Sequence, residues 1–144
     1  MRLVTQSDLN VTELPGIWHC RYWFPSNTHD GEDVSEYYVR IDQTADGFTL
    51  HSLPNRLKAY LQAHFTVESN LATGMWLENT SPTGEFGGMI YSGVFQLIIA
   101  EDAKSLHGRW VGIGRETDGS GAHIYEGRWE IDYAGAAEAD VPAL

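Results

Sequence analysis

Three side chains can donate or accept a proton and occur in segments rich in aromatic residues: Tyr22, Glu78 and His123. A carboxylic acid and an imidazole can act as general acid and general base, and burial among apolar groups shifts the pKa of each. Glu78 with His123, or Tyr22 with His123, therefore supports one hypothesis, a small lyase or isomerase. The alternative is that each is a core residue whose polar atoms are satisfied.

Other reactive residue types do not form a known site. The histidines lack His-x-x-x-His spacing, and a structural zinc site would need more cysteines than Cys20. The acidic run at 30–33 does not match an EF-hand loop. The glycine-rich segment 112–115 does not open a helix, so it is no phosphate cradle. We predict no metal and no cofactor, and a Cys20 that packs as an inert thiol.

Composition narrows the partners and the compartment. A net charge of −11 disfavours nucleic acid and anionic membranes, because both would repel the chain. The longest apolar stretch, Met89 to Ala100, is too short to span a bilayer, and the N-terminus shows no signal-peptide core. A single cysteine suits a reducing compartment, so we expect a cytoplasmic protein.

The elements that must position these residues are strands. The 144 residues amount to one domain and show eight short runs rich in aromatic and β-branched residues, separated by turn residues. The runs are Gly16–Phe24, Val34–Asp42, Gly47–Leu53, Lys58–Val67, Ala72–Glu78, Phe86–Ile99, Leu106–Arg115 and Ala122–Tyr133.

Sequential strands with short connections predict an all-β fold, an eight-stranded antiparallel up-and-down β-barrel over residues 16–133. A two-sheet sandwich is the structural alternative. Residues 1–15 form an N-terminal segment with one helical turn around Ser7–Leu14, and residues 134–144 form a flexible tail.

A Gly-x-Trp unit occurs four times, ending at Trp18, Trp76, Trp110 and Trp129. Residues two apart in a strand share a face, so each glycine leaves room for an indole on the inner side. A first strand that opens with Gly-x-Trp, and the stretch 83–88 before a long strand, resemble the calycin-type barrels, the lipocalins and avidins. The resemblance implies the fold but no ligand, because the lipocalin Thr-Asp-Tyr triplet and a clear biotin-binding set are missing.

The direction of the strands predicts a closed bottom and an open top. The four tryptophans should fill the lower half, and the longer connections, such as 25–33 and 79–85, should gather at the upper end, where long loops usually form the mouth of a site. Alternation places six side chains on the upper inner face, with Gly112 and Gly114 leaving space beside them: Tyr22, Phe24, Ser52, Glu78, His123 and Tyr125.

The cations indicate the ligand class. Arg21, Arg109, Arg115 and Arg128 should face solvent, whereas Arg56 and Lys58 lie on an upper loop. Because a buried unpaired charge is costly, we expect a sensor or carrier for a small neutral or aromatic ligand. An anionic ligand would need Arg56, Lys58 or Arg115 at the mouth. In that case the chain would be similar to the barrel receptors for cyclic nucleotides in bacterial defence.

Apolar residues on the outer face favour a homodimer. Ile17 and Trp23 have outward parity, and the sixth strand is apolar on both faces, with Tyr91, Phe95, Leu97 and Ile99 or the alternate set outside. A strand covered on both sides suggests a second subunit against the barrel wall.

Overall fold

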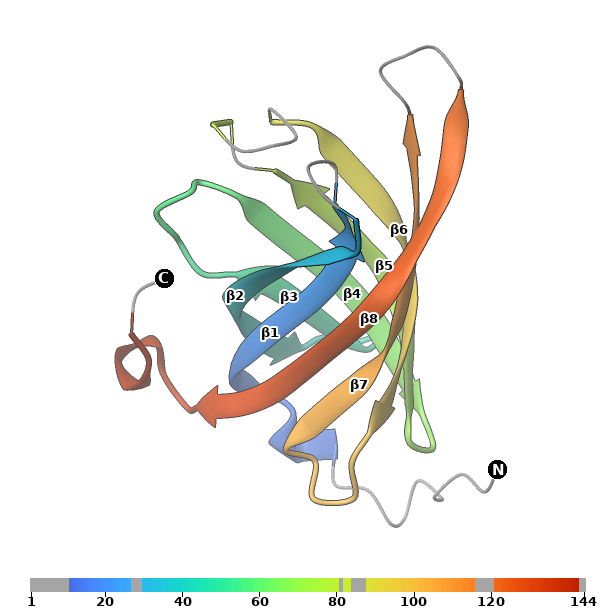
Figure 1. Ribbon diagram of the computed structural model, residues 1–144. Helices are drawn as coiled ribbons and strands as arrows, with labels where there is room; N and C mark the ends of the chain where they lie inside the picture. The colour runs from blue at the N-terminus through green and yellow to red at the C-terminus, as the bar shows by residue number, and fades with distance from the viewer. Residues whose placement is uncertain (1–10, 27–29, 81, 84–87, 116–120, 143–144) are drawn as a thin grey trace.

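Eight antiparallel strands form one closed barrel in the computed structural model, which describes residues 11–26, 30–80, 82–83, 88–115 and 121–142 (Figure 1). Each strand pairs with its neighbours in sequence, and β8 pairs with β1 to close the ring. The strands are β1 (Gly16–Pro25), β2 (Glu32–Gln43), β3 (Phe48–Ser52), β4 (Tyr60–Glu68), β5 (Leu71–Asn79), β6 (Ile90–Ile99), β7 (Ser105–Arg115) and β8 (Ala122–Gly135). The predicted up-and-down barrel is confirmed, and the sandwich alternative is wrong.

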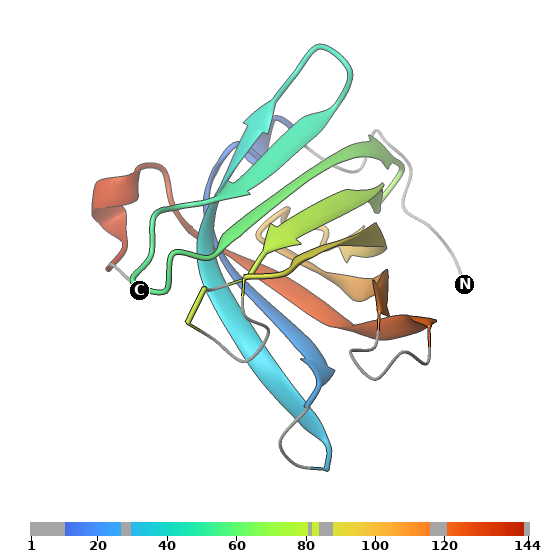
Figure 2. The same cartoon turned by 90° about the horizontal axis from the view of Figure 1, so that it is seen from above.

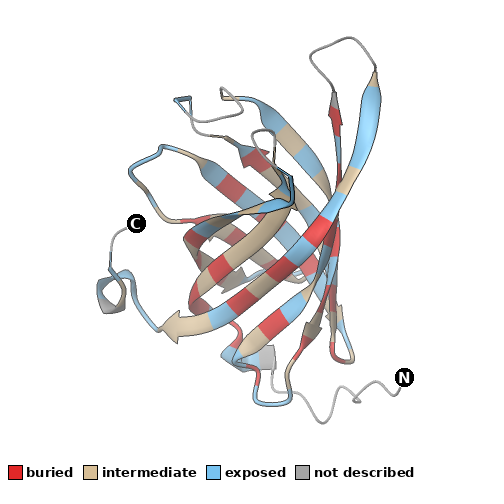
Figure 3. Ribbon diagram, in the orientation of Figure 1, coloured by how far each residue is buried: buried red, intermediate tan, exposed pale blue. Residues whose placement is uncertain are grey.

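Inward and outward residues alternate along the strands, as Figure 3 shows in red and pale blue. In β4, Leu61, Ala63 and Phe65 are buried, while the residues between them are exposed. This period of two is what a barrel wall requires, since one face of each strand packs inside and the other meets solvent.

Strand β4 begins two residues later than the sequence predicts. Lys58 has a positive φ of 57°, which interrupts the extended backbone before Tyr60. The side-chain amide of Asn55 bonds the backbone of Ala59 on both sides, donating to its carbonyl at 2.9 Å and accepting from its N–H at 3.2 Å. An asparagine that satisfies backbone groups in this way stabilises a turn in place of a strand.

Strand β6 begins at Ile90, not at Phe86 as predicted. Gly88 has a left-handed φ of 78°, which ends the extended conformation there. Beside it, the N–H of Thr80 donates to the carbonyl of Met89 at 2.9 Å. Residues 84–87 lie outside the described part of the chain.

The ends of the barrel domain carry two short 3-10 helices. Within the predicted N-terminal segment, η2 (Val11–Glu13) precedes β1, while residues 1–10 lie outside the described part. At the other end, β8 continues to Gly135 and η3 (Glu138–Asp140) follows, with Arg40 within 3.5 Å of the Glu138 carboxylate. Part of the segment predicted as a flexible tail therefore extends the wall.

The lower interior is sealed by aromatic and aliphatic side chains. Trp18 is fully buried, and its indole N–H donates to the carbonyl of Leu14 at 2.8 Å, which ties the segment before β1 to the floor. Trp129, 2% exposed, meets Phe95 edge to face at 4.8 Å between ring centroids. Buried aromatic area of this kind supplies much of a small barrel's stability.

The connections differ at the two ends, as predicted. At the lower end, residues 44–47, 69–70 and 100–104 join the strands, whereas 26–31, 53–59, 80–89 and 116–121 join them at the upper end. Seen from above, the strands form a ring (Figure 2). No helix among the described residues is long and apolar enough to cross a membrane.

Candidate functional site

A carboxyl group held by two phenols lies inside the upper barrel. Glu78 is 6% exposed, and its Oε2 accepts a hydrogen bond from Tyr37 at 2.6 Å and a second, short one from Tyr22. Tyr22 and Tyr37 belong to the adjacent strands β1 and β2, whereas Glu78 is on β5, on the opposite side of the ring. The cluster therefore bridges the interior from wall to wall.

Strand alternation explains why Glu78 points inward. It follows Gly74 and Trp76 at intervals of two along β5, and it is paired with Leu61 of β4. The buried Ser52 lies close by in the fold, because its Oγ accepts a hydrogen bond from the Leu61 N–H at 2.9 Å. This bond satisfies a backbone donor at the point where β3 has ended and β4 continues.

Burial raises the pKa of the Glu78 carboxyl above its ordinary value, and the hydrogen bonds from Tyr22 and Tyr37 partly offset this shift. The pKa of each phenol is also raised, first by burial and then by the negative charge of Glu78. The Ser35 hydroxyl bonds to both phenols and acts in the opposite direction on each pKa. Both tyrosines therefore stay protonated and act as donors to Glu78.

Aromatic rings continue from this cluster across the interior. Tyr22 and Tyr37 are nearly parallel, with centroids 6.4 Å apart and an interplanar angle of 13°. Trp110 meets Tyr22 edge to face at 6.3 Å, and Trp76 meets Trp110 edge to face at 5.6 Å. Trp110, 7% exposed, belongs to the same buried core as Trp18 and Trp129, as predicted, and it extends that core to Tyr22 of the polar cluster. Trp76 is only partly buried against this core.

All four of these indoles donate a hydrogen bond, which fixes their orientation. Trp76 donates to the Val94 carbonyl at 3.2 Å, and Trp110 donates to the Trp23 carbonyl at 3.0 Å. In the floor, Trp129 donates to the Cys20 sulfur at 2.7 Å. Burial raises the pKa of that thiol to about 12, so the expectation of an unreactive Cys20 agrees with its environment.

Solvent exposure of the inner face increases toward the upper end. Inward residues in the lower half, such as Val39, Leu50 and Leu97, are at most 1% exposed. In the upper half, five aromatic residues of the inner face are only half-buried: Tyr22, Phe24, Trp76, Tyr91 and Tyr125. The inner face is therefore less completely buried at its upper end than at its lower end.

The space expected beside the two glycines is filled. A Cβ on Gly112 would lie 2.6 Å from the Trp76 ring, and one on Gly114 would lie 2.9 Å from the Tyr125 ring. The prediction that these positions leave room for a ligand is therefore wrong. Each glycine makes room for an aromatic ring of the chain itself, as Gly127 also does for Trp110.

The remaining predicted residues are dispersed. His123 is exposed, with its ring 6.4 Å from that of Tyr125, and Glu78 takes its hydrogen bonds from the two tyrosines rather than from His123. Arg56 and Lys58 are exposed on the 53–59 connection. The side chain of Arg115 lies outside the described part of the structure.

Sequence reasoning missed Tyr37 and Ser35. A signal for them existed, since both share the parity of the buried Val39 and Ile41 on β2. The contact of Tyr37 with Glu78 could not be found in this way, because it joins strands on opposite sides of the ring.

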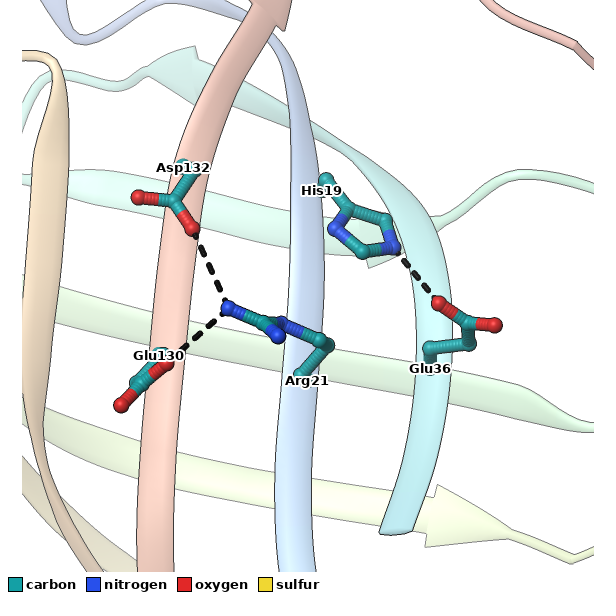
Figure 4. Close-up of polar contacts among 5 residues, drawn as sticks. All are labelled: His19, Arg21, Glu36, Glu130 and Asp132. Carbon is teal, nitrogen blue, oxygen red and sulfur yellow. Dashed lines mark hydrogen bonds and ion pairs between the residues drawn. The ribbon is translucent and has the colours of Figure 1, made fainter.

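The outer wall beside the site is charged (Figure 4). Arg21 on β1 contacts Glu130 at 3.0 Å and Asp132 at 3.7 Å, both on β8, and His19 contacts Glu36 of β2 at 2.7 Å. Arg21 thus faces outward, as predicted. The outward Trp23 has the guanidinium of Arg128 over its ring at 4.2 Å.

Comparisons with known proteins do not assign this chain to a family. No protein-family model matches the sequence, and a search of curated proteins finds no similar sequence. Among the described residues, no group of three or more histidines, cysteines or acids is placed to hold a metal ion.

Proposed function

We propose that this barrel is a small-molecule-binding protein, a sensor or carrier, that takes an aromatic ligand through the end bearing the longer connections. The observation that supports this is the exposure gradient of the inner face. Trp76, Tyr22 and Phe24 point inward yet remain in contact with solvent, while the floor below them is fully buried. Aromatic walls with a few convergent polar groups are typical of ligand sites.

Tryptophan fluorescence tests the proposal, because the chain has indoles inside and outside the barrel. A neutral nitroaromatic such as 4-nitrobenzyl alcohol quenches only the indoles that it contacts. We expect a saturable quenching component that the Trp76→Phe variant loses. The matched control is Trp23→Phe, which removes an indole from the outer wall and should leave that component unchanged.

Quenching that rises linearly with concentration, or a saturable component that survives in Trp76→Phe, would argue against the proposed site. Native mass spectrometry of the protein purified from its own host is the complementary test, since a carried ligand should appear as a discrete added mass.

We also propose that the protein works in a reducing compartment such as the cytoplasm and forms a homodimer through the outer wall of β5 to β8. Of the residues expected outside, Phe95, Leu97 and Ile99 are buried inside, and the alternate set faces out. Exposed apolar residues then run across neighbouring strands, with Met75 paired to Val94 and Ile113 paired to Ile124.

A second copy fits the part of this surface formed by β5 and β6, because the outward residues of these two strands are uncharged. Glu126 of β8 is in register with the apolar row through Val111, and its charge is opposed by Arg109 of β7 at 3.9 Å. Exposed apolar surface of this extent is typical of a protein interface.

A further inference from the structure

We infer that the ligand of this barrel carries a protonated amine, and that Glu78 is its counter-ion in the upper interior. The inference rests on the proposed binding function and narrows the ligand to an aromatic amine. We expected a neutral or aromatic ligand because no cation faces inward, and the same arrangement leaves a negative group without a positive partner.

The carboxyl group of Glu78 contacts no lysine or arginine among the described residues. On the same inner face, the basic side chain of His123 is exposed, and its ring lies 6.4 Å from that of Tyr125. The polar contacts of Glu78 are two neutral phenols, Tyr22 and Tyr37. A buried carboxylate needs a positive partner to be ionised at low cost, and a bound ammonium supplies one.

One oxygen of Glu78 remains available. Both phenols bond to Oε2, and a carboxylate can accept about four hydrogen bonds in total. Oε1 accepts neither of the phenol bonds, so it is the oxygen that would accept an N–H of a ligand.

The walls next to Glu78 suit a cation. Trp76 is two residues away on the same face of β5, and Trp110 and Tyr22 continue the aromatic lining. The face of an aromatic ring attracts an ammonium group, most strongly for tryptophan. The net charge of −11 acts in the same direction at longer range, because it raises the local concentration of cationic ligands.

Three probes of equal ring and similar length test the inference: 2-phenylethylamine, 2-phenylethanol and phenylacetate. They differ at the end of the chain, which is cationic, neutral or anionic at pH 7. By isothermal titration calorimetry we expect the amine to bind at least tenfold more tightly than the alcohol, and phenylacetate to bind more weakly than both. This comparison uses the wild-type protein and does not depend on whether a variant folds.

The Glu78→Gln variant assigns the preference to this carboxyl, since an amide still accepts the phenol hydrogen bonds but carries no charge. We expect the amine and the alcohol to bind it with affinities within twofold of each other. The matched control is Glu126→Gln, which removes the same charge from the exposed outer face of β8 and should keep the tenfold preference.

Equal binding of the amine and the alcohol to the wild-type protein would overturn the inference, as would a preference that persists in Glu78→Gln. Neither result contradicts the proposed function. If 2-phenylethanol binds and the Trp76→Phe variant weakens its binding, the barrel still has an aromatic site in the upper interior. If none of the three probes binds, the inference fails, and the quenching experiment decides separately whether the barrel binds aromatic molecules.

Discussion

Replacing Gly112 by alanine should destabilise the barrel mainly through Trp76, because the other close atom, the Ser92 carbonyl oxygen, would lie at a milder 3.2 Å from the added Cβ. The added Cβ would lie 2.6 Å from Trp76 Cζ2 and 3.0 Å from Cη2, whereas ordinary carbon contact begins at 3.4 Å. The indole must therefore retreat by about 0.8 Å. It is held by its hydrogen bond to the Val94 carbonyl and by the edge-to-face contact with Trp110. Overpacking of this kind costs about 1–3 kcal/mol.

With a smaller ring at position 76, the effect of Gly112→Ala on the free energy of unfolding should vanish or change sign. Without a clash, alanine in a strand is favoured over glycine by about 0.5–1 kcal/mol. Phenylalanine at position 76 lacks the two indole atoms that the new Cβ would meet. Gly112→Ala should therefore lower the free energy of unfolding by about 1–2 kcal/mol in the wild-type background. In the Trp76→Phe background it should leave stability unchanged or raise it slightly.

Urea denaturation of the four proteins in this double-mutant cycle measures the coupling between the two positions. The coupling should be at least about 1 kcal/mol, which corresponds to about 3 °C in melting temperature for a domain near this size. An equal loss of stability in both backgrounds would refute the assignment of the clash to Trp76, and no loss in either would refute the packing of the indole over Gly112.

Three further outcomes follow from the structure. Because burial raises the folded-state pKa of Glu78, ionising this group costs stability as pH rises through that pKa. In urea titrations, Glu78→Gln should therefore stabilise the protein at pH 8 and less so at pH 4. A gain in stability that does not depend on pH would contradict this. Cys20, with a pKa of about 12, should resist iodoacetamide at pH 8 until the protein is unfolded, so rapid labelling of the native protein would show that the floor opens. In sedimentation velocity, Val94→Glu should abolish dimers, whereas the control Gln96→Glu, on the same outer face, should keep them at the same concentration. A wild-type protein that is monomeric at high concentration would exclude the interface.

Some features were determined by the sequence alone. Eight runs with turn residues between them predicted the strands, their order and the closed barrel, because alternation of apolar and polar residues and short connections depend only on neighbours along the chain. The same alternation placed Tyr22, Ser52 and Glu78 on the inner face and Arg21 on the outer face. The boundaries at Tyr60 and Ile90 escaped prediction, because a side-chain bond from Asn55 and a left-handed Gly88 set them locally.

Only the tertiary structure decided what meets across the interior. Tyr37 and Glu78 are on β2 and β5, and the curvature and closure of the ring, which no residue spacing encodes, bring their oxygen atoms to 2.6 Å. The same holds for Gly112, whose empty position the indole of Trp76 fills across two intervening strand pairings. Spacing along a strand fixes the face on which a side chain lies, but its height, its rotamer and its partner from another strand depend on how all eight strands coil together.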